Sequence, residues 1–400
     1  MPMNKYIIFT FLFISNSLLA QIKPGVWHGE LILHDTIALP FNFEVVGNKA
    51  TIRNADERIT ADIKLHDDSD IIRLPDFDAE IHVKNDQEIL TGEFFNLSRK
   101  TENVIPFRAL INSPFRFFDR PEKTNVDITG NWKATFDGED DENKNSLAIF
   151  KQEGNHVTGT FLTNTGDYRY LEGEMGGNQI YLSTFDGAHA FLFTAEVIDN
   201  KIINGHFFSG LHWHDTWSAV RDEKFQLPDE RSFTHLKDGF SKIEFSFPDI
   251  NGNIVSLADA RFKNKVVIIQ IMGSWCPNCL DETRFLSQWI NTKNNKNIQV
   301  VGLDYEKITD TITAYKNIKR MIDRYSIQYP VLFAGSNNRE LSSKTLPMLN
   351  RVFSYPTTIF INKDGTVREI HTGFNGPATG QYFETFKIKF NKLIDDMLLN

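Results

Sequence analysis

Residues 266–279, VVIIQIMGSWCPNC, decide how the C-terminal part of this chain folds. The stretch opens with Val266–Ile271, which is apolar except for Gln270 and is typical of a buried β-strand. It closes with Cys276 and Cys279, the only cysteines among the 400 residues of the chain. Any sulfur chemistry in this protein therefore takes place at this pair.

Two cysteines at this spacing can bind zinc, form a structural disulfide or act as a redox-active dithiol. A zinc site normally needs a second pair of Cys or His residues at similar spacing, and none is evident in the sequence. A structural disulfide stabilises more when it closes a longer loop, and the ring between Cys276 and Cys279 is nearly the shortest. The strand before the pair and the helical pattern after it favour the dithiol, with a bridge or a partial metal site as alternatives.

Pro277, which follows the first cysteine, indicates where the helix begins. Pro277 is suited to the first helical position, where a missing N–H has no cost, so Cys276 falls at the N-cap. A thiolate is favoured there, because the unpaired N–H groups form a positive helix end. We therefore predict that Cys276 attacks a substrate disulfide and that Cys279, one turn further on, resolves the mixed disulfide.

The helical spacing places a carboxyl group beside this dithiol. Glu282 shares the face of Cys279, Thr283 and Leu286, whereas Asp281 falls on a second face with polar residues. A carboxyl group on an apolar face either handles protons or extends its head to solvent. We favour the first role for Glu282, because burial raises the pKa of a carboxyl group toward the working pH.

A second motif follows later in the chain, in the run Tyr355-Pro356-Thr357-Thr358 that leads through a strand to Lys363-Asp364-Gly365. Together with Trp275 and the cysteine pair, it resembles the TlpA/ResA-like thiol–disulfide oxidoreductases of the thioredoxin superfamily, over residues 240–400. The resemblance implies that Pro356 is a cis-proline against the cysteines and that Tyr355 offers its backbone to substrate; we add Trp275 as a substrate contact. The other interpretation of Pro356 is an ordinary strand-start proline.

The remaining pattern of residues 240–400 is that of an α/β thioredoxin-like domain, with strands alternating with helices. A hairpin is predicted around Asn251-Gly252, because two short apolar runs flank this turn pair. A closing helix is predicted at its end, with aromatic residues that we assign to the core. The predicted elements are the hairpin 245–257, a strand at 298–303, a helix at 309–325, a strand at 329–333 and the closing helix 382–399.

The first residues of the chain resemble a secretory signal. The run Tyr6–Leu19 is mostly apolar and ends at Ala20, which predicts a signal peptide over residues 1–20 with cleavage before Gln21. A signal anchor is the alternative. No later stretch has the length of a membrane helix, so we expect no stable membrane insertion and an exported protein, periplasmic or extracytoplasmic, where disulfides persist.

The composition is that of a globular, multidomain chain: 41% of the residues are hydrophobic and 24% are charged. The net charge is −9 and no dense Lys/Arg cluster occurs, which makes nucleic acid and anionic membrane surfaces poor partners. The acidic run 138–143 lacks the spaced ligands of a calcium loop, so we interpret it as a solvated hairpin loop.

Residues 21–225 are predicted to be β-rich, because short alternating runs are cut by Gly, Asn and Asp. They also contain a weak repeat in preserved order: Gly25-Val26-Trp27 matches Gly130-Asn131-Trp132, and Thr91–Phe95 matches Asn204–Phe208. We predict two tandem antiparallel modules, each an up-and-down barrel or a sandwich. The modules span residues 21–112 and 127–225, with a link at 113–126 and a polar linker at 222–239.

Three histidines of the second module suggest a metal site. His212 and His214 would point to the same side of one strand near His206, but Asp215 would face the opposite side. We therefore expect no metal here, and the dithiol chemistry requires no cofactor.

These patterns predict an exported protein thiol–disulfide oxidoreductase that exchanges disulfides with protein disulfide or dithiol substrates. Reduction is the favoured direction, although direction depends on a reduction potential that Pro277 and Asn278 tune. Another dithiol protein, not identified by the sequence, must resupply the electrons. The alternative is an envelope ligand-binding β protein with an accessory or inactive thioredoxin-like domain; a peroxidase role for Cys276 is a lesser one.

Overall fold

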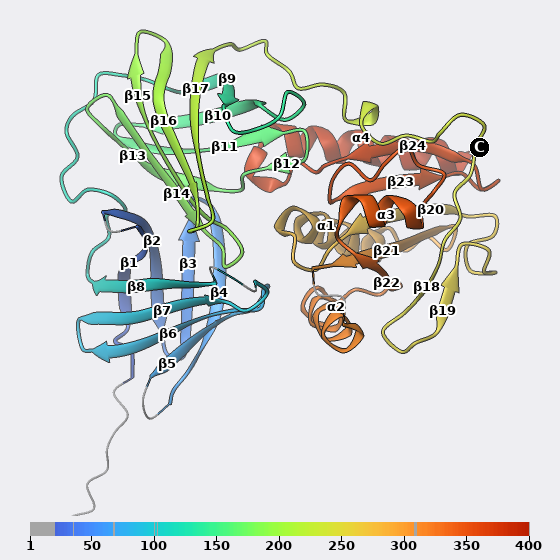
Figure 1. Cartoon of the computed structure of the whole chain (residues 1–400), viewed down its shortest axis with the longest axis horizontal. Helices are drawn as coiled ribbons and strands as arrows, with labels where there is room; N and C mark the ends of the chain where they lie inside the picture. Colours follow the sequence, from blue (N-terminus) through green and yellow to red (C-terminus); the bar gives the residue numbers. More distant parts are fainter. Residues whose placement is uncertain are drawn as a thin grey trace, which may run out of the picture.

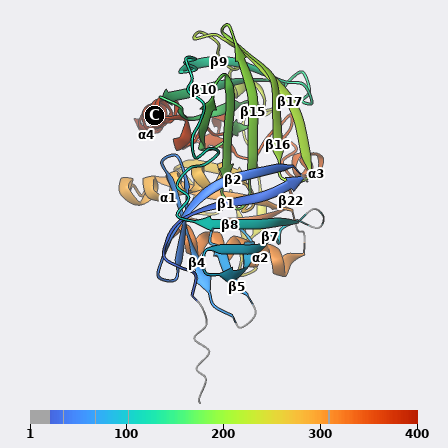
Figure 2. The ribbon, with the colours of Figure 1, turned by 90° about the vertical axis from the view of Figure 1, so that its left-hand side faces the viewer.

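The computed structural model describes residues 21–399, apart from 35, 67–68, 100, 102 and 308–309. It contains three units in chain order, two β-barrels and a C-terminal α/β unit (Figure 1). Figure 2 shows the second barrel stacked on the first. The predicted signal peptide, residues 1–20, lies outside the described residues.

The first barrel is a closed ring of eight antiparallel strands. Each strand pairs with the next in sequence, and the last returns to the first through the pairing of Trp27 with Ile111. Side chains alternate between a buried interior and an exterior, because successive residues of a strand point to opposite faces. The strands are β1 (Gly25–His34), β2 (Ile37–Val46), β3 (Lys49–Asn54), β4 (Glu57–Lys64), β5 (Asp70–Leu74), β6 (Ala79–Asp86), β7 (Ile89–Asn96) and β8 (Val104–Ile111).

The second barrel follows the same plan and closes where β10 pairs with β11. A short extra strand, β12, lies within residues 164–170, which connect β11 to β13; we call these residues the β11–β13 insertion. The strands are β9 (Gly130–Phe136), β10 (Asn145–Glu153), β11 (His156–Thr163), β12 (Gly166–Asp167), β13 (Leu171–Gly176), β14 (Gln179–Phe185), β15 (Ala190–Ile198), β16 (Lys201–Ser209) and β17 (Trp213–Arg221).

The two barrels repeat one another in detail. The indole N–H of Trp27 in β1 donates to the carbonyl of Lys23 at 3.0 Å, and that of Trp132 in β9 donates to the carbonyl of Ile128 at 2.9 Å. Gly92 in β7 corresponds to Gly205 in β16, since a side chain at either would collide with the backbone of the neighbouring strand. The predicted β-rich character is confirmed, and both sheets close as barrels.

Arg116 in the link between the barrels joins them. Its fully buried guanidinium donates to the Asn54 side chain at 2.9 Å and to the Ser183 hydroxyl at 2.8 Å, one from each barrel. It also forms an ion pair with Glu172 at 3.1 Å. Because a buried cation is stable only when it is paired and hydrogen-bonded, this arginine holds the two barrels in one arrangement.

The C-terminal unit is a five-stranded sheet in the order β22-β21-β20-β23-β24, with β20, β21 and β22 parallel and the other two strands antiparallel to their neighbours. Helices α1 and α4 pack on one face of this sheet, where Leu286 and Phe390 join one core. Its elements are β18 (Ser246–Pro248), β19 (Ile254–Ser256), β20 (Val266–Met272), α1 (Pro277–Lys293), β21 (Ile298–Glu306), α2 (Thr311–Tyr325), β22 (Val331–Ser336), α3 (Arg339–Thr345), β23 (Thr357–Ile361), β24 (Val367–Thr372) and α4 (Gln381–Leu399), with short 3-10 turns at Glu230–Ser232 and Pro377–Thr379.

Most of the elements predicted for this unit are present, with shifted ends. The hairpin forms as the pair β18–β19, and the closing helix is α4. Strand β21 extends to Glu306 rather than ending at Leu303, and β22 begins at Val331 rather than Tyr329. Helix α3 was not predicted. In the part of the chain that the structure describes, no helix is both long and apolar enough to cross a membrane.

Candidate active site

The cysteine pair lies at the start of α1. Cys276 is the N-cap residue, Pro277 opens the helix, and the backbone N–H of Cys279 donates to the sulfur of Cys276 at 3.3 Å. Both cysteines are free thiols, with Cys276 6% exposed and Cys279 fully buried. Both cysteines are therefore buried in this arrangement, and Cys276 is the more exposed of the two.

The segment before β23 lies against this sulfur. The Tyr355–Pro356 peptide bond is cis, and Thr357 pairs with Ile271 of the strand that leads to the cysteines. The thiol of Cys276 donates to the Tyr355 carbonyl at 3.5 Å. The backbone of Tyr355 thus borders the position that a substrate disulfide would occupy, and Trp275 packs edge-on against the Tyr355 ring.

Glu282 lies below the dithiol in a closed polar network. It is 3% exposed and accepts hydrogen bonds from the Thr358 hydroxyl at 2.6 Å and the Gln270 amide at 2.9 Å. Gln270 is the polar residue of the buried strand, and its amide also donates to the Cys279 carbonyl at 3.1 Å. Burial raises the pKa of Glu282 to about 7, against the two hydrogen bonds that lower it.

Cys279 differs strongly from an ordinary thiol. Burial raises its pKa well above the usual value, and the hydrogen bond and charge of Cys276 raise it further, with a smaller contribution from Glu282. Loss of the Cys279 proton therefore needs an acceptor within the protein. Glu282 is the buried carboxyl group one turn along the same helix and takes part in the network that reaches the Cys279 carbonyl.

We predict that Glu282→Gln slows disulfide exchange about 100-fold near neutral pH, because the amide cannot accept the proton of Cys279. Folded Glu282 binds its proton more tightly than the unfolded chain does, because its pKa is raised from 4.5 to about 7. The free energy of unfolding should therefore fall as the pH rises through this range and the folded state gives up that proton. The variant should lack this loss. Exchange rates and urea unfolding, measured from pH 4.5 to 9 for both proteins, check the prediction. Superimposable rate profiles would leave Glu282 with a structural role alone.

Two further acidic residues flank Tyr305, whose backbone carbonyl accepts a hydrogen bond from the Trp275 indole, and no sequence pattern predicted them. Asp304 and Glu306 are fully buried in the end of β21, beyond the predicted strand. Burial raises the pKa of Asp304 well above its usual value, and the neighbouring Glu306 raises it further. Glu306 accepts a short hydrogen bond from Ser274. Burial and the neighbouring Glu306 therefore favour the protonated form of Asp304.

The β11–β13 insertion of the second barrel contacts the cysteine helix directly. The side-chain amide of Asn278, which lies between the two cysteines, donates to the backbone carbonyl of Asp167 at 3.1 Å. The Asp167 carboxylate accepts from the backbone N–H of Gly376 at 2.6 Å. The unit that carries the dithiol is thus hydrogen-bonded to both the backbone and the side chain of Asp167.

Arg169 forms the electrostatic centre of this contact. Its guanidinium donates short hydrogen bonds to Asp281 of α1 and to Glu57 of the first barrel, and it lies 3.4 Å from a carboxylate oxygen of Asp186. Burial opposes its charge, but these carboxylates raise the pKa of Arg169 well above its usual value. All three units therefore meet at one buried cation, and Asp281 is 6% exposed despite its place on the polar face of the helix.

The acids around this arginine have shifted pKa values, and burial decides the direction of the shift for two of them. It raises the pKa of Asp167 to about 6 and also raises the pKa of Asp281, although Arg169 acts in the opposite direction on both. Asp186 differs, because the hydrogen bonds and charges of His189 and the charge of Arg169 outweigh burial and lower its pKa to about 2. The folded arrangement therefore favours the ionised form of Asp186 but the protonated forms of Asp167 and Asp281.

The barrels also cover the flank of the site. A small cavity of about 100 Å³ lies between Trp275 and Pro277 on one side and Phe77, Ala188 and His189 of the barrels on the other. Lys307 places its ammonium 4.5 Å from the Trp275 ring. The residues on either side of Cys276 in the sequence, Trp275 and Pro277, thus border this cavity.

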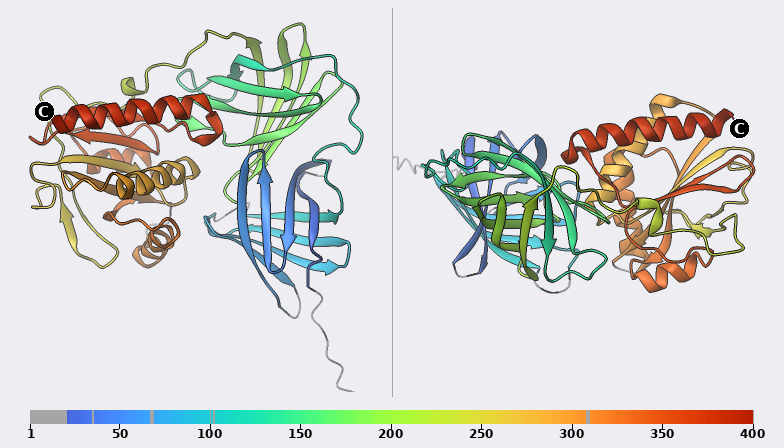
Figure 3. Two further views of the ribbon diagram at one scale, coloured as in Figure 1. Left: turned by 180° about the vertical axis from the view of Figure 1, so that it is seen from behind. Right: turned by 90° about the horizontal axis from the view of Figure 1, so that it is seen from above.

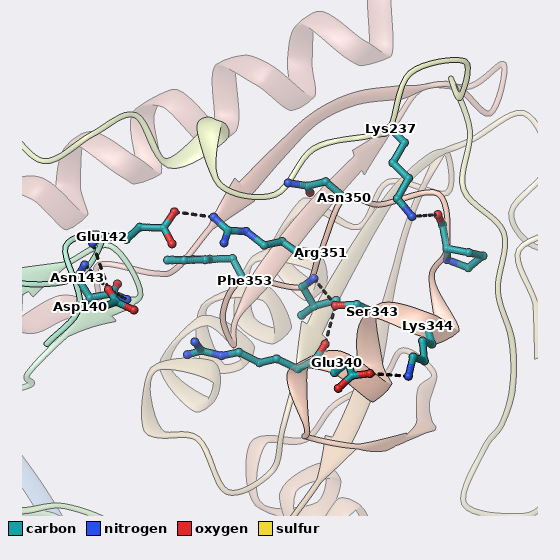
Figure 4. Close-up of a pocket in the computed structure, with 13 residues that line it drawn as sticks. Asp140, Glu142, Asn143, Lys237, Glu340, Ser343, Lys344, Asn350, Arg351 and Phe353 are labelled. Carbon is teal, nitrogen blue, oxygen red and sulfur yellow. Dashed lines mark hydrogen bonds and ion pairs between the residues drawn. The ribbon is translucent and has the colours of Figure 1, made fainter.

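Another contact joins the second barrel to α3 and its flanking residues (Figure 4). Glu142, at the end of the acidic run, forms an ion pair with Arg351 at 2.6 Å. The Arg351 guanidinium lies 4.6 Å from the centre of the Phe353 ring. The run is an exposed loop, as expected, but it also takes part in docking between units.

The three histidines of the second barrel do not gather into one cluster. His212 lies in the turn before β17 rather than on the strand with His214, so the predicted shared face is wrong. His206 lies 3.1 Å from His214, while His212 contacts Arg99 at 3.1 Å. The described residues contain no group of His, Cys, Asp and Glu side chains arranged to hold a metal ion.

Known proteins match the unit that carries this site. Residues 241–370 match the model of the AhpC/TSA family. The chain is 25% identical over 138 residues to the thioredoxin-like protein YneN of Bacillus subtilis, covering 34% of this chain and 73% of YneN. It is 26% identical over 145 residues to the thiol-disulfide oxidoreductase ResA of Bacillus cereus, covering 34% of this chain and 75% of ResA.

This region is a TlpA/ResA-like domain of the thioredoxin superfamily. A solved structure of a thiol:disulfide interchange protein of the thioredoxin family from Chlorobium tepidum covers 40% of this chain and 99% of its own, with 20% identity and a TM-score of 0.30. The assignment of the TlpA/ResA-like domain rests on the family model and on the sequence relatives. These matches concern the C-terminal part of the chain and do not explain the two barrels.

Proposed function

We propose that this chain is an exported thiol–disulfide oxidoreductase that exchanges disulfides with protein substrates, in the direction of reduction. One observation carries the proposal: Cys276 caps α1 beside the backbone of Tyr355, while Cys279 and Glu282 lie buried behind it. An attacking sulfur at the helix N-cap, a resolving sulfur behind it and a carboxyl group with a pKa of about 7 are the groups that dithiol exchange requires.

The first half of the reaction takes place at Cys276. Its thiolate, stabilised by the N–H of Cys279 and the positive end of α1, attacks one sulfur of the substrate disulfide. A bond forms between Cys276 and that sulfur, the substrate S–S bond breaks, and the second substrate sulfur leaves as a thiolate that takes up a proton. The backbone of Tyr355 and the ring of Trp275 hold the substrate chain in place.

The second half transfers the electrons to the substrate. Glu282 accepts the proton of Cys279, whose thiolate attacks the sulfur of Cys276 and forms the Cys276–Cys279 disulfide. The bound substrate sulfur leaves and is protonated, so the substrate gains two electrons and two protons in all. Another dithiol protein, which the chain does not identify, must then reduce the new disulfide.

The alternative assigns ligand binding to the barrels and an accessory role to the TlpA/ResA-like domain. Aromatic side chains fill the second barrel, with Trp132, Phe161 and Phe193 fully or almost fully buried inside it. A packed interior offers no site for a ligand within this barrel. Its contacts with α1 instead support a role in controlling access to the dithiol.

The proposal is tested with the purified full-length chain. It should catalyse the reduction of insulin by dithiothreitol, and Cys276→Ser should reduce this activity to less than about 1%, because the remaining buried thiol is rarely ionised. The Cys276–Cys279 disulfide should stay oxidised in a buffer with equal amounts of reduced and oxidised glutathione. A protein that reduces its substrates has a reduction potential below that of glutathione, so glutathione does not reduce its disulfide. Inertness toward insulin together with rapid consumption of a hydroperoxide would replace exchange by the peroxidase role.

A further inference from the structure

The small cavity beside Trp275 and Pro277 is lined by charged side chains from the barrels and from the TlpA/ResA-like domain. Helix α2 lies beside the first barrel, as the view from behind shows (Figure 3), and Arg320 of this helix lies 3.6 Å from a carboxylate oxygen of Asp78 in that barrel. The volume of about 100 Å³ is enough for several water molecules or for one carboxylate group. We call this cavity the charged recess and define it by Asp78, Arg99, Trp275, Glu306, Lys307 and Arg320.

Positive charge outnumbers negative charge in the charged recess. Three of the side chains that define it are cations, namely Arg99, Lys307 and Arg320, and two are carboxylates, Asp78 and Glu306. The chain as a whole has a net charge of −9, so this local excess is opposite in sign to the charge of the molecule. A cationic group is therefore disfavoured in the charged recess, and an anionic group is favoured.

Both carboxylates of the charged recess already have partners. One oxygen of Asp78 lies 3.2 Å from the guanidinium of Arg73 and 3.6 Å from that of Arg320. Glu306 accepts hydrogen bonds from two neutral side chains, a serine hydroxyl and an asparagine amide. The two acids are therefore held by other groups, and neither forms an ion pair with Lys307 among the described residues.

Lys307 lies in the charged recess without a carboxylate partner in the part of the chain that the structure describes. Its ammonium is 4.5 Å from the centre of the Trp275 ring. The residue is exposed overall, but partial loss of hydration lowers the pKa of its ammonium, and the charge of Arg99 lowers this pKa further. An anion in the charged recess would offset both effects, because opposite charges attract most strongly where water is partly excluded.

The charged recess adjoins the attacking sulfur. Trp275 and Pro277 both line it, and they are the neighbours of Cys276 in the sequence. The negative charge of Cys276 raises the pKa of Lys307, so the charge of one residue acts on the other. A group that a substrate carries close to its disulfide therefore meets the positive potential of Lys307 when Cys276 attacks.

We propose that the charged recess binds a carboxylate that a substrate carries beside its disulfide, a conclusion that rests on the proposed function. The favoured substrates are then disulfides of cysteines that have an acidic neighbour. Lys307 attracts the carboxylate, and Arg99 and Arg320 add positive charge around it. The carboxylate takes no part in the sulfur exchange itself and speeds the attack by holding the disulfide against Cys276.

The test compares 3,3′-dithiodipropionate with its diamide, 3,3′-dithiodipropionamide. The two disulfides have the same length, but only the first carries carboxylates. Each is mixed in excess with the reduced full-length chain at pH 7 and low salt, and formation of the Cys276–Cys279 disulfide is followed by mass spectrometry. The ratio of the two rates, divided by the same ratio for 2-mercaptoethanol, should favour the acid about tenfold and should fall at high salt. A ratio equal to that of the free thiol would overturn the site.

Variants locate the site. Lys307→Met removes the charge and keeps most of the side-chain length, so the tenfold preference should fall to about twofold. Any change in the ionisation of Cys276 affects both disulfides alike and cancels in the ratio. Lys316→Met is the matched control, because Lys316 is an exposed lysine of α2 that does not line the charged recess. Unfolding curves establish that both variants are folded. An unchanged preference in Lys307→Met, or an equal loss in both variants, would contradict the assignment.

The two proposals fail separately. A chain that reacts with neither disulfide contradicts the proposed function. Alkylation of Cys276 then still tests the charged recess, because iodoacetate carries a carboxylate, iodoacetamide does not, and neither reagent needs disulfide exchange. Relative to 2-mercaptoethanol, Cys276 should favour iodoacetate several-fold, and Lys307→Met should remove this preference. Relative rates equal to those of the free thiol would show that the charged recess attracts no carboxylate.

Discussion

Cys279→Ser should accumulate stable mixed disulfides with substrate proteins, bound through Cys276. The variant keeps the attacking sulfur at the helix N-cap but lacks the thiol that breaks the adduct. Nearly all of the protein should therefore be trapped when it is mixed with excess insulin, as measured by non-reducing electrophoresis and by mass spectrometry of the adduct.

Cys276→Ser is the matched comparison, since it removes the other sulfur by the same change. Fewer than about one adduct in a hundred should form in this variant, because Cys279 is fully buried and its raised pKa keeps it protonated. Equal trapping by the two variants, or more trapping through Cys279, would reverse the assigned roles.

Arg169→Met should destabilise the chain by about 3–5 kcal/mol at pH 7.5, the range for removing one partner of a buried ion pair. The change leaves the carboxylates of Asp281, Glu57 and Asp186 without their shared cation. The loss should shrink as the pH falls through about 6, where Asp167 takes up a proton, because fewer buried charges then oppose one another. Urea unfolding at pH 7.5 and pH 5 measures both effects.

Arg108→Met is the control for this variant. Arg108 also pairs with a carboxylate, Glu30, but its side chain is 61% exposed, so the cost should stay below about 1 kcal/mol. Alkylation of Cys276 provides a second measurement, and it should accelerate in Arg169→Met alone. A loss of stability with unchanged alkylation would show that Arg169 supports the fold without holding the barrels over the dithiol.

Local patterns were sufficient to place much of the site. The spacing after Cys279 predicted that Glu282 faces inward, and the proline predicted the start of α1, since both depend only on the geometry of a single helix. The alternating runs and matching glycines of residues 21–225 predicted a repeated β structure, because alternation and turns depend only on the geometry of neighbouring strands. These patterns can be recognised in a single sequence because the residues that form each of them are close together in the chain.

Contacts between distant segments could not be predicted in this way. Asp281 was assigned to a polar helix face, yet the second barrel buries it, because Arg169 lies 112 residues earlier in the chain. Asp304 and Glu306 resemble polar residues after a strand and are instead part of the strand itself. A cavity of about 540 Å³ likewise has walls from three parts of the chain, with Leu162 from the second barrel, Leu227 from the linker and Phe386 from α4, so no single stretch of sequence predicts its shape.

The β11–β13 insertion also bears on how the two barrels came to differ. In the first barrel β3 and β4 are joined directly by Ala55 and Asp56, whereas the insertion occupies the same position in the second copy and lies outside the ring that closes it. Its strand β12 pairs with β11 over two residues, and the barrel closes through the pairing of β10 with β11 without it. The two barrels are therefore not equivalent, because the second barrel alone carries this insertion at the connection between its third and fourth long strands. Exchanging their order along the chain would preserve two intact barrels and yet remove Asp167 and Arg169 from the cysteine helix.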